Sequence, residues 1–269
     1  MTRLDIVATL LTCGLVSSAC KTQQASPPSP PSEPAVPTAP PAPSAPPAPP
    51  PPLPAAAGEP TEAELAADPH KHMKAHFAHA LKLQDAVLAG KLDDAKAQGR
   101  WLTEHEASEV PAGWKPYIPE FRARSKAAAD AKSLDEAAVA VSYIAASCGA
   151  CHAANKITPH IGESPITRSA KSIKEHMVYQ VQALNKMWEG LVVPSDVAWK
   201  EGASVLSKVA VSDKALAKEK KDGVESAKLL ATTLRRLSAT AGKAAKDDRP
   251  QAFADLLTTC VACHGAVRK

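Results

Sequence analysis

Apolar side chains recur at helical spacing in two long segments, residues 61–89 and 167–188. Within each segment, apolar residues three, four or seven positions apart fall on one face, which is typical of a helix with one side in a protein core. The first face carries Leu65, Met73, Phe77, Leu81 and Leu88, and the second carries Ile173, Met177, Val181, Leu184 and Trp188. Both segments are therefore predicted to be amphipathic helices, one at the start of each half of the folded region.

Start and stop signals divide the rest of residues 61–269 into further helices. Ser133 with Glu136 matches a capping box, as do the pairs that begin at Thr61 and Asp248. Asp68-Pro69 offers a second start for the first helix, because proline suits the first helical position. The other predicted helices cover 92–109, 120–130, 133 to beyond 152, 195–209, 213–241 with a break near 223, and 248–264.

The composition agrees with this pattern. Aromatic residues make up 4% of the chain and there are only 12 glycines in 269 residues. Ala, Leu, Lys and Glu, which are good helix formers, are abundant. The sequence therefore predicts an all-α fold with about four helices in each half, and no span after the first twenty residues that is long and apolar enough to cross a bilayer.

The N-terminal sixty residues differ from the rest of the chain. Arg3, an apolar stretch over 6–16 and the small residues 17–19 are typical of a secretory signal, so residues 1–19 are predicted to be removed on export. Cys20 then stands where a bacterial lipoprotein carries its lipid, although Ser17 replaces the usual leucine; ordinary cleavage that leaves a free thiol is the alternative. Seventeen of the 25 prolines lie between residues 27 and 60, which predicts a Pro-rich, disordered linker over 20–60.

Two short cysteine motifs carry the chemistry. Cys148-Gly149-Ala150-Cys151-His152 recurs 112 positions later as Cys260-Val261-Ala262-Cys263-His264. Cys-x-x-Cys-His is the attachment pattern of c-type haem, in which the two thiols bind the haem and the histidine ligates its iron. On a helix, residues at i, i+3 and i+4 lie on one side, so one turn provides all three groups. A zinc site or a redox dithiol are the alternatives, but structural zinc needs four closed ligands and a thioredoxin-like dithiol belongs in a βαβ context.

With these motifs at the end of the last helix of each half, the chain resembles the cytochrome c′ family and its low-spin relatives. That resemblance implies two tandem antiparallel four-helix bundles over residues 61–165 and 166–269, each with a covalent haem c. The proximal iron ligands would be His152 and His264. A multihaem chain with little regular structure is the alternative architecture.

The resemblance also places a distal iron ligand on the first helix of each half. Met73 and Met177 occupy the predicted core-facing stripe, whereas His72 and His176 lie about 100° away at its flank. Methionine on such a stripe is often plain core, and three further histidines of the first helix compete for the first iron. These are His70, His76 and His79, whereas Lys174 stands in the second half where His70 stands in the first. The two irons are therefore expected to differ in ligation or spin state.

Charge adds little to this picture. The net charge is +4, and it is spread over lysine-rich helix faces such as the one with Lys214, Lys218, Lys220 and Lys221. No pattern of alternating basic and aromatic residues suggests nucleic-acid binding. A basic face can steer an acidic redox partner protein, but the sequence does not identify one.

These observations favour an exported dihaem cytochrome, periplasmic or anchored as a lipoprotein, that transfers electrons between partner proteins. The alternative is a protein that binds or senses gas ligands at a vacant distal face. An enzyme such as a dihaem peroxidase is least favoured, because it needs a distal acid–base group. Glu104, His105 and Glu106 are available, but nothing in the sequence places them at a haem.

Overall fold

A computed structural model describes residues 63, 67–105, 110–161, 172–216 and 223–267. These residues belong to one compact unit, residues 56–269. The regular structure in the described ranges is helical, which confirms the predicted all-α class. The predicted signal, the lipid site at Cys20 and the Pro-rich linker lie outside the described residues.

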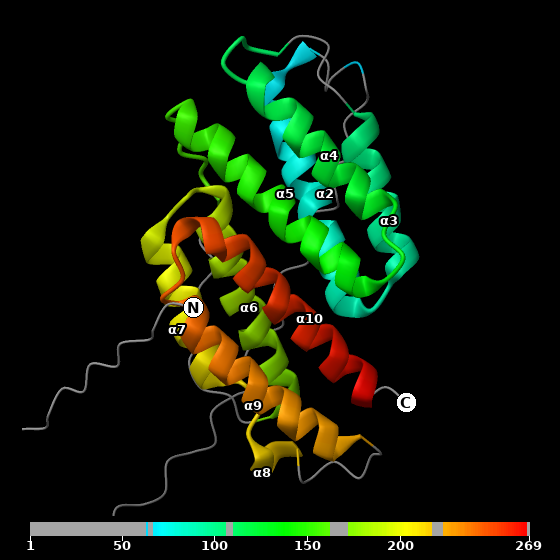
Figure 1. Ribbon diagram of the computed structural model, residues 1–269, viewed down its shortest axis with the longest axis vertical. Helices are drawn as coiled ribbons and strands as arrows, with labels where there is room; N and C mark the ends of the chain where they lie inside the picture. The colour runs from blue at the N-terminus through cyan, green and yellow to red at the C-terminus, as the bar shows by residue number, and fades with distance from the viewer. Residues whose placement is uncertain (1–62, 64–66, 106–109, 162–171, 217–222, 268–269) are drawn as a thin grey trace, which may run out of the picture. The chain divides into compact units, whose positions relative to one another are not determined.

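The described part of the first half contains four long helices, and each one packs against the helix that follows it in the chain (Figure 1). Helix α2 contacts α3 and α5, α3 contacts α4, and α4 contacts α5. These helices are α2 (Pro69–Ala89), α3 (Leu92–Glu104), α4 (Ile118–Ala129) and α5 (Leu134–Ala154), with a 3₁₀ turn, η1 (Lys115–Tyr117), before α4.

Two start signals in this half work as predicted. Asp68 Oδ1 accepts hydrogen bonds from the backbone amides of His70 (2.8 Å) and Lys71 (3.3 Å), so Asp68-Pro69 begins α2. Ser133 Oγ accepts the amide of Glu136 (3.1 Å) and thereby caps α5. The predicted end of α3 at residue 109 is wrong.

Helix α3 ends earlier because His105 adopts an extended backbone conformation at the C-cap. Its amide still donates to the Trp101 carbonyl (3.1 Å), but its own carbonyl turns toward α2 and accepts from the His76 ring (2.8 Å). At His105, a contact with α2 thus accompanies the end of α3.

The second half repeats this order with one added element. Helix α6 contacts α7, α7 contacts α9, and α9 contacts α10. The helices are α6 (Ile173–Val192), α7 (Asp196–Val209), the short α8 (Asp213–Leu216), α9 (Val224–Ala241) and α10 (Arg249–Val267), with a 3₁₀ turn, η2 (Lys246–Asp248), before α10.

Most predicted boundaries of this half agree with the structure. Ser195 caps α7, and the predicted break near Gly223 separates α8 from α9. The start predicted at Thr167 lies outside the described residues, and α6 begins after its N-cap Ser172. The capping box predicted at Asp248 is wrong, because Asp248 ends η2 and the Gln251 side chain donates to Asp255 (2.8 Å) instead.

The two halves keep the same register along the chain. Pro69 begins α2, and Ile173, 104 positions later, begins α6. Buried positions follow the same offset, since Leu83 and Val87 in α2 correspond to Met187 and Leu191 in α6. After α3 and α7 the offset becomes the 112 positions that separate the two cysteine motifs, because the segment that carries α8 lengthens the second half.

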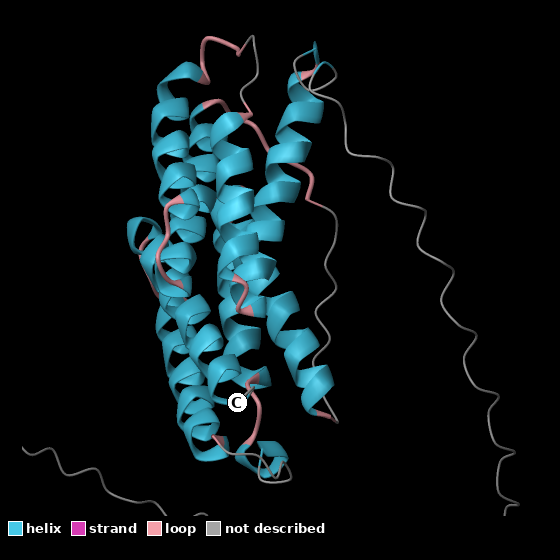
Figure 2. Ribbon diagram, turned by 90° about the vertical axis from the view of Figure 1, so that its right-hand side faces the viewer, coloured by secondary structure: helices cyan, strands magenta, loops and turns pink. Residues whose placement is uncertain are grey.

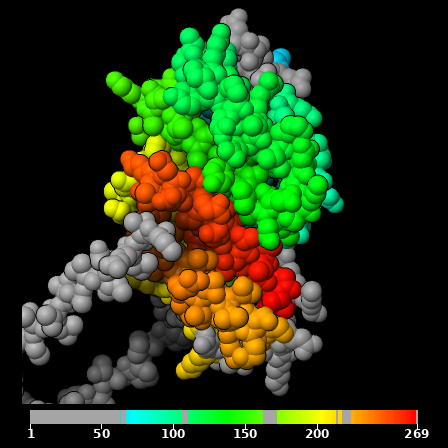
Figure 3. Space-filling view, in the orientation of Figure 1, coloured from blue at the N-terminus to red at the C-terminus, as the bar shows by residue number. Residues whose placement is uncertain are grey.

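The halves also share a core. Helix α5 packs on α10 and α6, and α2 packs on α10 (Figure 1). Figure 2 shows that the elements that pack in this way are helices joined by loops. The main buried cluster takes Leu83 and Ile144 from the first half and Leu184 and Leu257 from the second. In the space-filling view, α10 in red lies directly against α5 in green (Figure 3). The division into domains at residue 165 remains a prediction, and a boundary there runs through one continuous core.

Helix α5 differs from the expectation that no later segment could span a bilayer. Its 21 residues, Leu134–Ala154, have a mean hydropathy of 1.4 over the best 18-residue window, which meets the length and composition of a span. Half of that window is buried within the protein, where α5 packs against helices of both halves. A central core helix satisfies the same two criteria.

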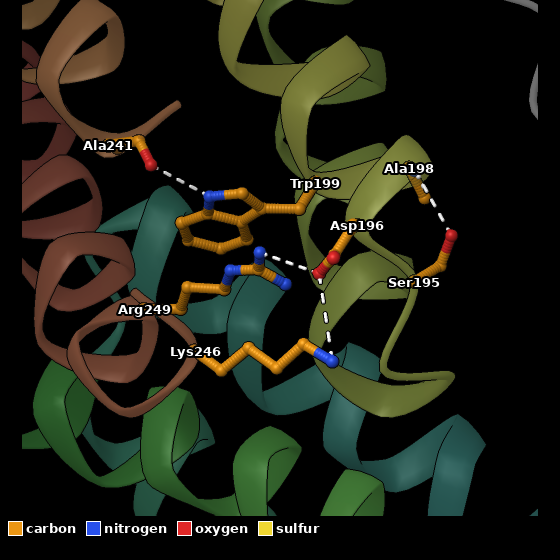
Figure 4. A network of polar contacts seen from close by, with 7 residues as sticks. All are labelled: Ser195, Asp196, Ala198, Trp199, Ala241, Lys246 and Arg249. Carbon is orange, nitrogen blue, oxygen red and sulfur yellow. Dashed lines mark hydrogen bonds and ion pairs between the residues drawn. The ribbon is translucent and has the colours of Figure 1, made fainter. Parts of the chain in front are cut away.

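A polar network fixes one end of the second half (Figure 4). Arg249 donates through Nη2 to Asp196 Oδ1 (2.7 Å), and its guanidinium lies over the Trp199 ring (5.4 Å). The Trp199 indole donates through Nε1 to the Ala241 carbonyl (2.7 Å). The hydrogen bond from Arg249 lowers the pKa of the Asp196 carboxyl. The network ties the starts of α7 and α10 to the end of α9.

Candidate functional site

Both cysteine motifs lie in the last turns of a long helix. Cys148, Cys151 and His152 lie on α5, and Cys260, Cys263 and His264 on α10. None of these four cysteines forms a disulfide. Helical spacing therefore puts two thiols and one imidazole on the same side of a single turn in each motif.

Each motif histidine is held by a backbone carbonyl of the other half. His152 Nδ1 lies 2.8 Å from the Val192 carbonyl at the end of α6, and His264 Nδ1 lies 2.8 Å from the Leu88 carbonyl at the end of α2. A carbonyl can only accept, so Nδ1 carries the hydrogen, and in the neutral ring Nε2 is then the nitrogen with the lone pair. This is the tautomer in which Nε2 can ligate a metal, and the outer hydrogen bond fixes the orientation of the ring.

The cap of α2 leaves the Leu88 carbonyl available for His264. Gly90 follows the helix in the left-handed conformation (φ 73°), and the backbone amides of the cap bond the carbonyls of Ala86 and Val87. The last carbonyls of a helix have no partner within the helix, and Leu88 finds one in His264.

The end of α6 is arranged in the same way. Its carbonyls at Glu189 and Gly190 accept amides from beyond the helix, at 2.8 and 3.1 Å, whereas Val192 is bonded by His152. Leu88 and Val192 are 104 positions apart, so the two crossed hydrogen bonds join equivalent helix ends. The motifs are thus related by the same repeat as the helices.

The thiols are weakly acidic, and their side chains are half-buried except for the buried Cys260. Burial, with a smaller contribution from the neighbouring thiol, raises the pKa of Cys148 and of Cys260 to about 12. Burial also raises the pKa of Cys151 and of Cys263. Reactive redox dithiols have a lowered thiol pKa, so these surroundings are the opposite of those a thioredoxin-like site needs.

The second motif opens onto an apolar cavity of about 250 Å³. Its walls include Cys260, Cys263 and His264 from α10 and Met177 from α6. The rest of the lining is Ile173, Gln180, Val211, Leu216, Val224, Leu230, Ala231, Leu234, Thr259 and Val267. Thiols, an oriented imidazole and a thioether on the walls of one aliphatic cavity fit a covalent haem with histidine and methionine as axial ligands.

The predicted orientation of the first helix is wrong for the first half. His72 is buried, with 3% of its surface exposed, whereas Met73 is only half-buried. The buried face of α2 runs through His72, His79, Leu83 and Val87, because α2 packs against α3, α5 and α10 at once. Met73 as a distal ligand stays a prediction.

In the second half, His176 behaves as a flanking residue, as expected. Its Nδ1 lies 3.0 Å from the Val209 carbonyl at the end of α7, whereas Met177 faces the cavity. The structure therefore brings Met177 to the second motif.

The first half contains a cluster of rings that the sequence analysis missed. Trp101 stacks between His79 (3.6 Å between centroids) and His105 (4.1 Å), and His76 stacks on Phe121 (5.3 Å). The regular signal was present, since His72, His76 and His79 recur at spacings of four and three residues. The competing histidines are thus separated: His76 and His79 join this cluster, whereas the His70 side chain is exposed.

The ring of His76 lies in surroundings that strongly disfavour its charged form. Burial, with the nearby His72 as a smaller cause, lowers the pKa of His76 to about 3. Its Nε2 donates to the His105 carbonyl (2.8 Å), and Gln180, 104 positions later, donates to the Val209 carbonyl (3.4 Å). His76 therefore occupies the position whose counterpart lines the second cavity, with an uncharged ring.

Among the described residues, no group of three or more His, Cys, Asp or Glu side chains converges as a ready-made metal site. A haem iron takes at most two axial ligands from the protein, so it needs no such group. Of the acid–base candidates for a peroxidase, Glu106 lies outside the described residues and His105 stacks on Trp101.

Comparison of the chain with protein-family models, with curated proteins and with solved structures finds no match.

Proposed function

We propose that the chain is a dihaem c-type cytochrome that carries electrons between redox partner proteins. Cys148 and Cys151 would hold one haem c and Cys260 and Cys263 the other, with one histidine of each motif as proximal ligand to iron. The observation that carries this proposal is the second cavity, because both thiols, His264 and Met177 line the same apolar cavity. The crossed hydrogen bonds of both histidines support it.

Bound haem would supply one-electron exchange at its iron. The chain's own residues would fix and tune it. The thiols anchor the macrocycle, and the Nδ1 hydrogen bonds of His152 and His264 keep Nε2 as the metal-binding nitrogen. The aliphatic lining around Met177 would exclude water from the second site, and histidine–methionine ligation raises the potential.

Two tandem antiparallel four-helix bundles, each like cytochrome c′, remain the proposed architecture. The repeat of helix order and buried positions supports it, with α2 to α5 as one set and α6, α7, α9 and α10 as the other. The shared core makes the two sets parts of one unit rather than independent modules.

Export to the periplasm, with or without a lipid on Cys20, completes the proposal. Covalent haem of this type is attached outside the bacterial cytoplasm, and the N-terminal pattern of small and apolar residues before Cys20 supports export. The partners would be redox proteins, and the net charge of +4 favours an acidic one.

The test is spectroscopic, on the purified haem-loaded protein. Intact mass should show two covalent haems, and optical and low-temperature paramagnetic resonance spectra should show six-coordinate, low-spin iron at one or both sites. Met177→Leu should abolish the methionine-ligated signal of one haem. Met187→Leu is the matched control, because Met187 lies on the same helix, fully buried in the core.

Other outcomes would redirect the proposal. High-spin iron that shifts with carbon monoxide in the wild type, unchanged by Met177→Leu, would favour a gas-binding protein. Absence of covalent haem would overturn the proposal altogether.

A further inference from the structure

We infer that each half of the chain builds the proximal side of the other half's haem site, and that Gly149 is the positioning residue for this arrangement at His152. The inference rests on the proposed function, because it concerns the ligand that would hold iron. It goes further because it proposes that the reduction potential of each iron depends on a helix end of the opposite half.

Gly149 lets α6 reach the first motif. A Cβ atom at this position would overlap the Leu191 carbonyl oxygen, and the Pro194 ring lies nearby, so only glycine fits there. Leu191 directly precedes Val192, whose carbonyl accepts from His152 Nδ1 (2.8 Å). The small residue between the two cysteines thus sets the distance at which the helix end meets the histidine.

The Val192 carbonyl that accepts from His152 lies at the C-terminal end of a helix, and this position adds to its effect. The C-terminal end of a helix carries a partial negative charge from its unpaired carbonyls. A hydrogen bond to such a group raises the basicity of a histidine ligand. A more basic ligand favours ferric over ferrous iron, so the end of α6 should lower the potential of the first haem.

The same relation holds in the opposite direction. His264 Nδ1 donates to Leu88 at the end of α2, which belongs to the first half. The buried side chain of Gln84 and the half-buried side chain of Asn185 join α2 and α6 directly, with Gln84 Nε2 donating to Asn185 Oδ1 (2.9 Å). The two helices whose ends serve the histidines are therefore also linked to each other.

The experiment compares Gly149→Ala with Gly265→Ala in the full chain. Both replace a helical glycine within or beside a motif, but a Cβ at Gly265 meets nothing within 4 Å. Haem content by intact mass and midpoint potentials by redox titration are measured for the wild type and both variants. Nitrogen-15 spectra report the His152 Nδ1–H, and its coupling to the Val192 carbonyl carbon is measured in the wild type.

Gly149→Ala is expected to keep two haems and to raise the midpoint potential of one of them. The hydrogen on His152 Nδ1 should also exchange faster with solvent, because its hydrogen bond to Val192 is weakened. If the histidine of the variant favours ferric over ferrous iron tenfold less than in the wild type, the midpoint potential rises by about 59 mV for this one-electron couple. Gly265→Ala should leave both potentials unchanged.

Several results would overturn the inference. Unchanged potentials in a Gly149→Ala protein with two haems would do so, as would equal shifts in both variants. If Gly149→Ala does not fold, the coupling from His152 Nδ1–H to Val192 in the wild type decides alone, and its absence refutes the inference. Absence of haem would overturn the proposed function, yet detection of that coupling in the haem-free chain would still support the crossed hydrogen bonds.

Discussion

The two motifs sit on equivalent turns of equivalent helices, yet their surroundings differ in kind. Beside the second motif lies an aliphatic cavity that Met177 enters. In the first half, the position that corresponds to Gln180 is His76, and it belongs to a cluster of imidazole and aromatic rings. Cys151 of the first motif also lies beside the Asn155 amide (Nδ2 to Sγ 3.6 Å), whereas Val267 stands at the corresponding place in the second half and lines its cavity.

The difference shows which properties are repeated and which are local. Helix register, the buried stripe and the hydrogen bond from each motif histidine recur in both halves. The residues around the two motifs do not recur. The scaffold therefore presents the same Cys-x-x-Cys-His pattern twice in separate environments, and if both motifs hold haem as we propose, the two irons are expected to differ in potential.

The largest effect is expected from removing one attachment point. Replacement of Cys260 and Cys263 by alanine should reduce the haem content from two to one per chain, because both thioether anchors of the second site are lost. Intact mass and the optical spectrum should then report the first site alone.

The mirror variant, with alanine at Cys148 and Cys151, should report the second site alone. If the two single-site spectra are identical, the contrast between the distal environments has no consequence for iron.

A second comparison concerns the tryptophans of the two halves. Trp199→Phe removes a fully buried hydrogen bond to the Ala241 carbonyl and should cost about 2 kcal/mol of unfolding free energy. Trp101, half-buried between His79 and His105, should tolerate phenylalanine at a cost of about 1 kcal/mol or less. Urea unfolding of both variants measures the difference, and equal costs would contradict it.

The histidine cluster predicts acid sensitivity for the first half. The pKa of His76 is about 3 in the folded chain and near 6.5 in the unfolded one, so only the unfolded chain binds a proton between these values. The contribution of His76 to the free energy of unfolding is therefore fully present above pH 6.5. It falls as the pH drops toward 3, by at most about 1.4 kcal/mol per pH unit.

His76→Gln, which places the second-half residue in the first half, should flatten this pH profile. His160→Gln serves as the control because His160 is exposed. Unfolding curves at pH 7, 6 and 5 provide the readout, and parallel profiles for wild type and His76→Gln would refute the prediction.

The smallest effect is expected where α2 meets α6. Asn185→Ala removes the acceptor of the fully buried Gln84 amide and should cost about 1 kcal/mol. The double variant with leucine at both positions should recover part of that loss, because an apolar pair leaves no buried donor unsatisfied. Denaturation midpoints of the three proteins test this, and a double variant less stable than the single one would argue against it.

Local signals in the sequence were sufficient for most of the helices. Asp68, Ser133 and Ser195 each cap the helix that follows, and the break near Gly223 is present. Met177 lines the cavity beside the second motif, on the face of α6 that its apolar stripe predicted, although Val181 of that stripe is exposed. Such features depend on residues within one or two helical turns of each other, which a periodic pattern records.

Features that depend on distant partners were not accessible in this way. The burial of His72 follows from the several helices that surround α2, and propensity does not encode their positions. The early end of α3 follows from the His105 carbonyl turning to His76. Leu88 and Val192 act through backbone carbonyls, which all residues share, so no side-chain pattern marks them.

The hydrogen bond between His264 and Leu88 also constrains the order in which the molecule can form. Leu88 lies in the first long helix of the described chain and His264 in the last, 176 residues later. Closing so long a loop is slow and entropically costly, and contacts of this separation slow folding. The Leu88 carbonyl therefore lacks its His264 partner until α10 has joined the fold, and the second site is finished only when the end of the chain returns to its first helix.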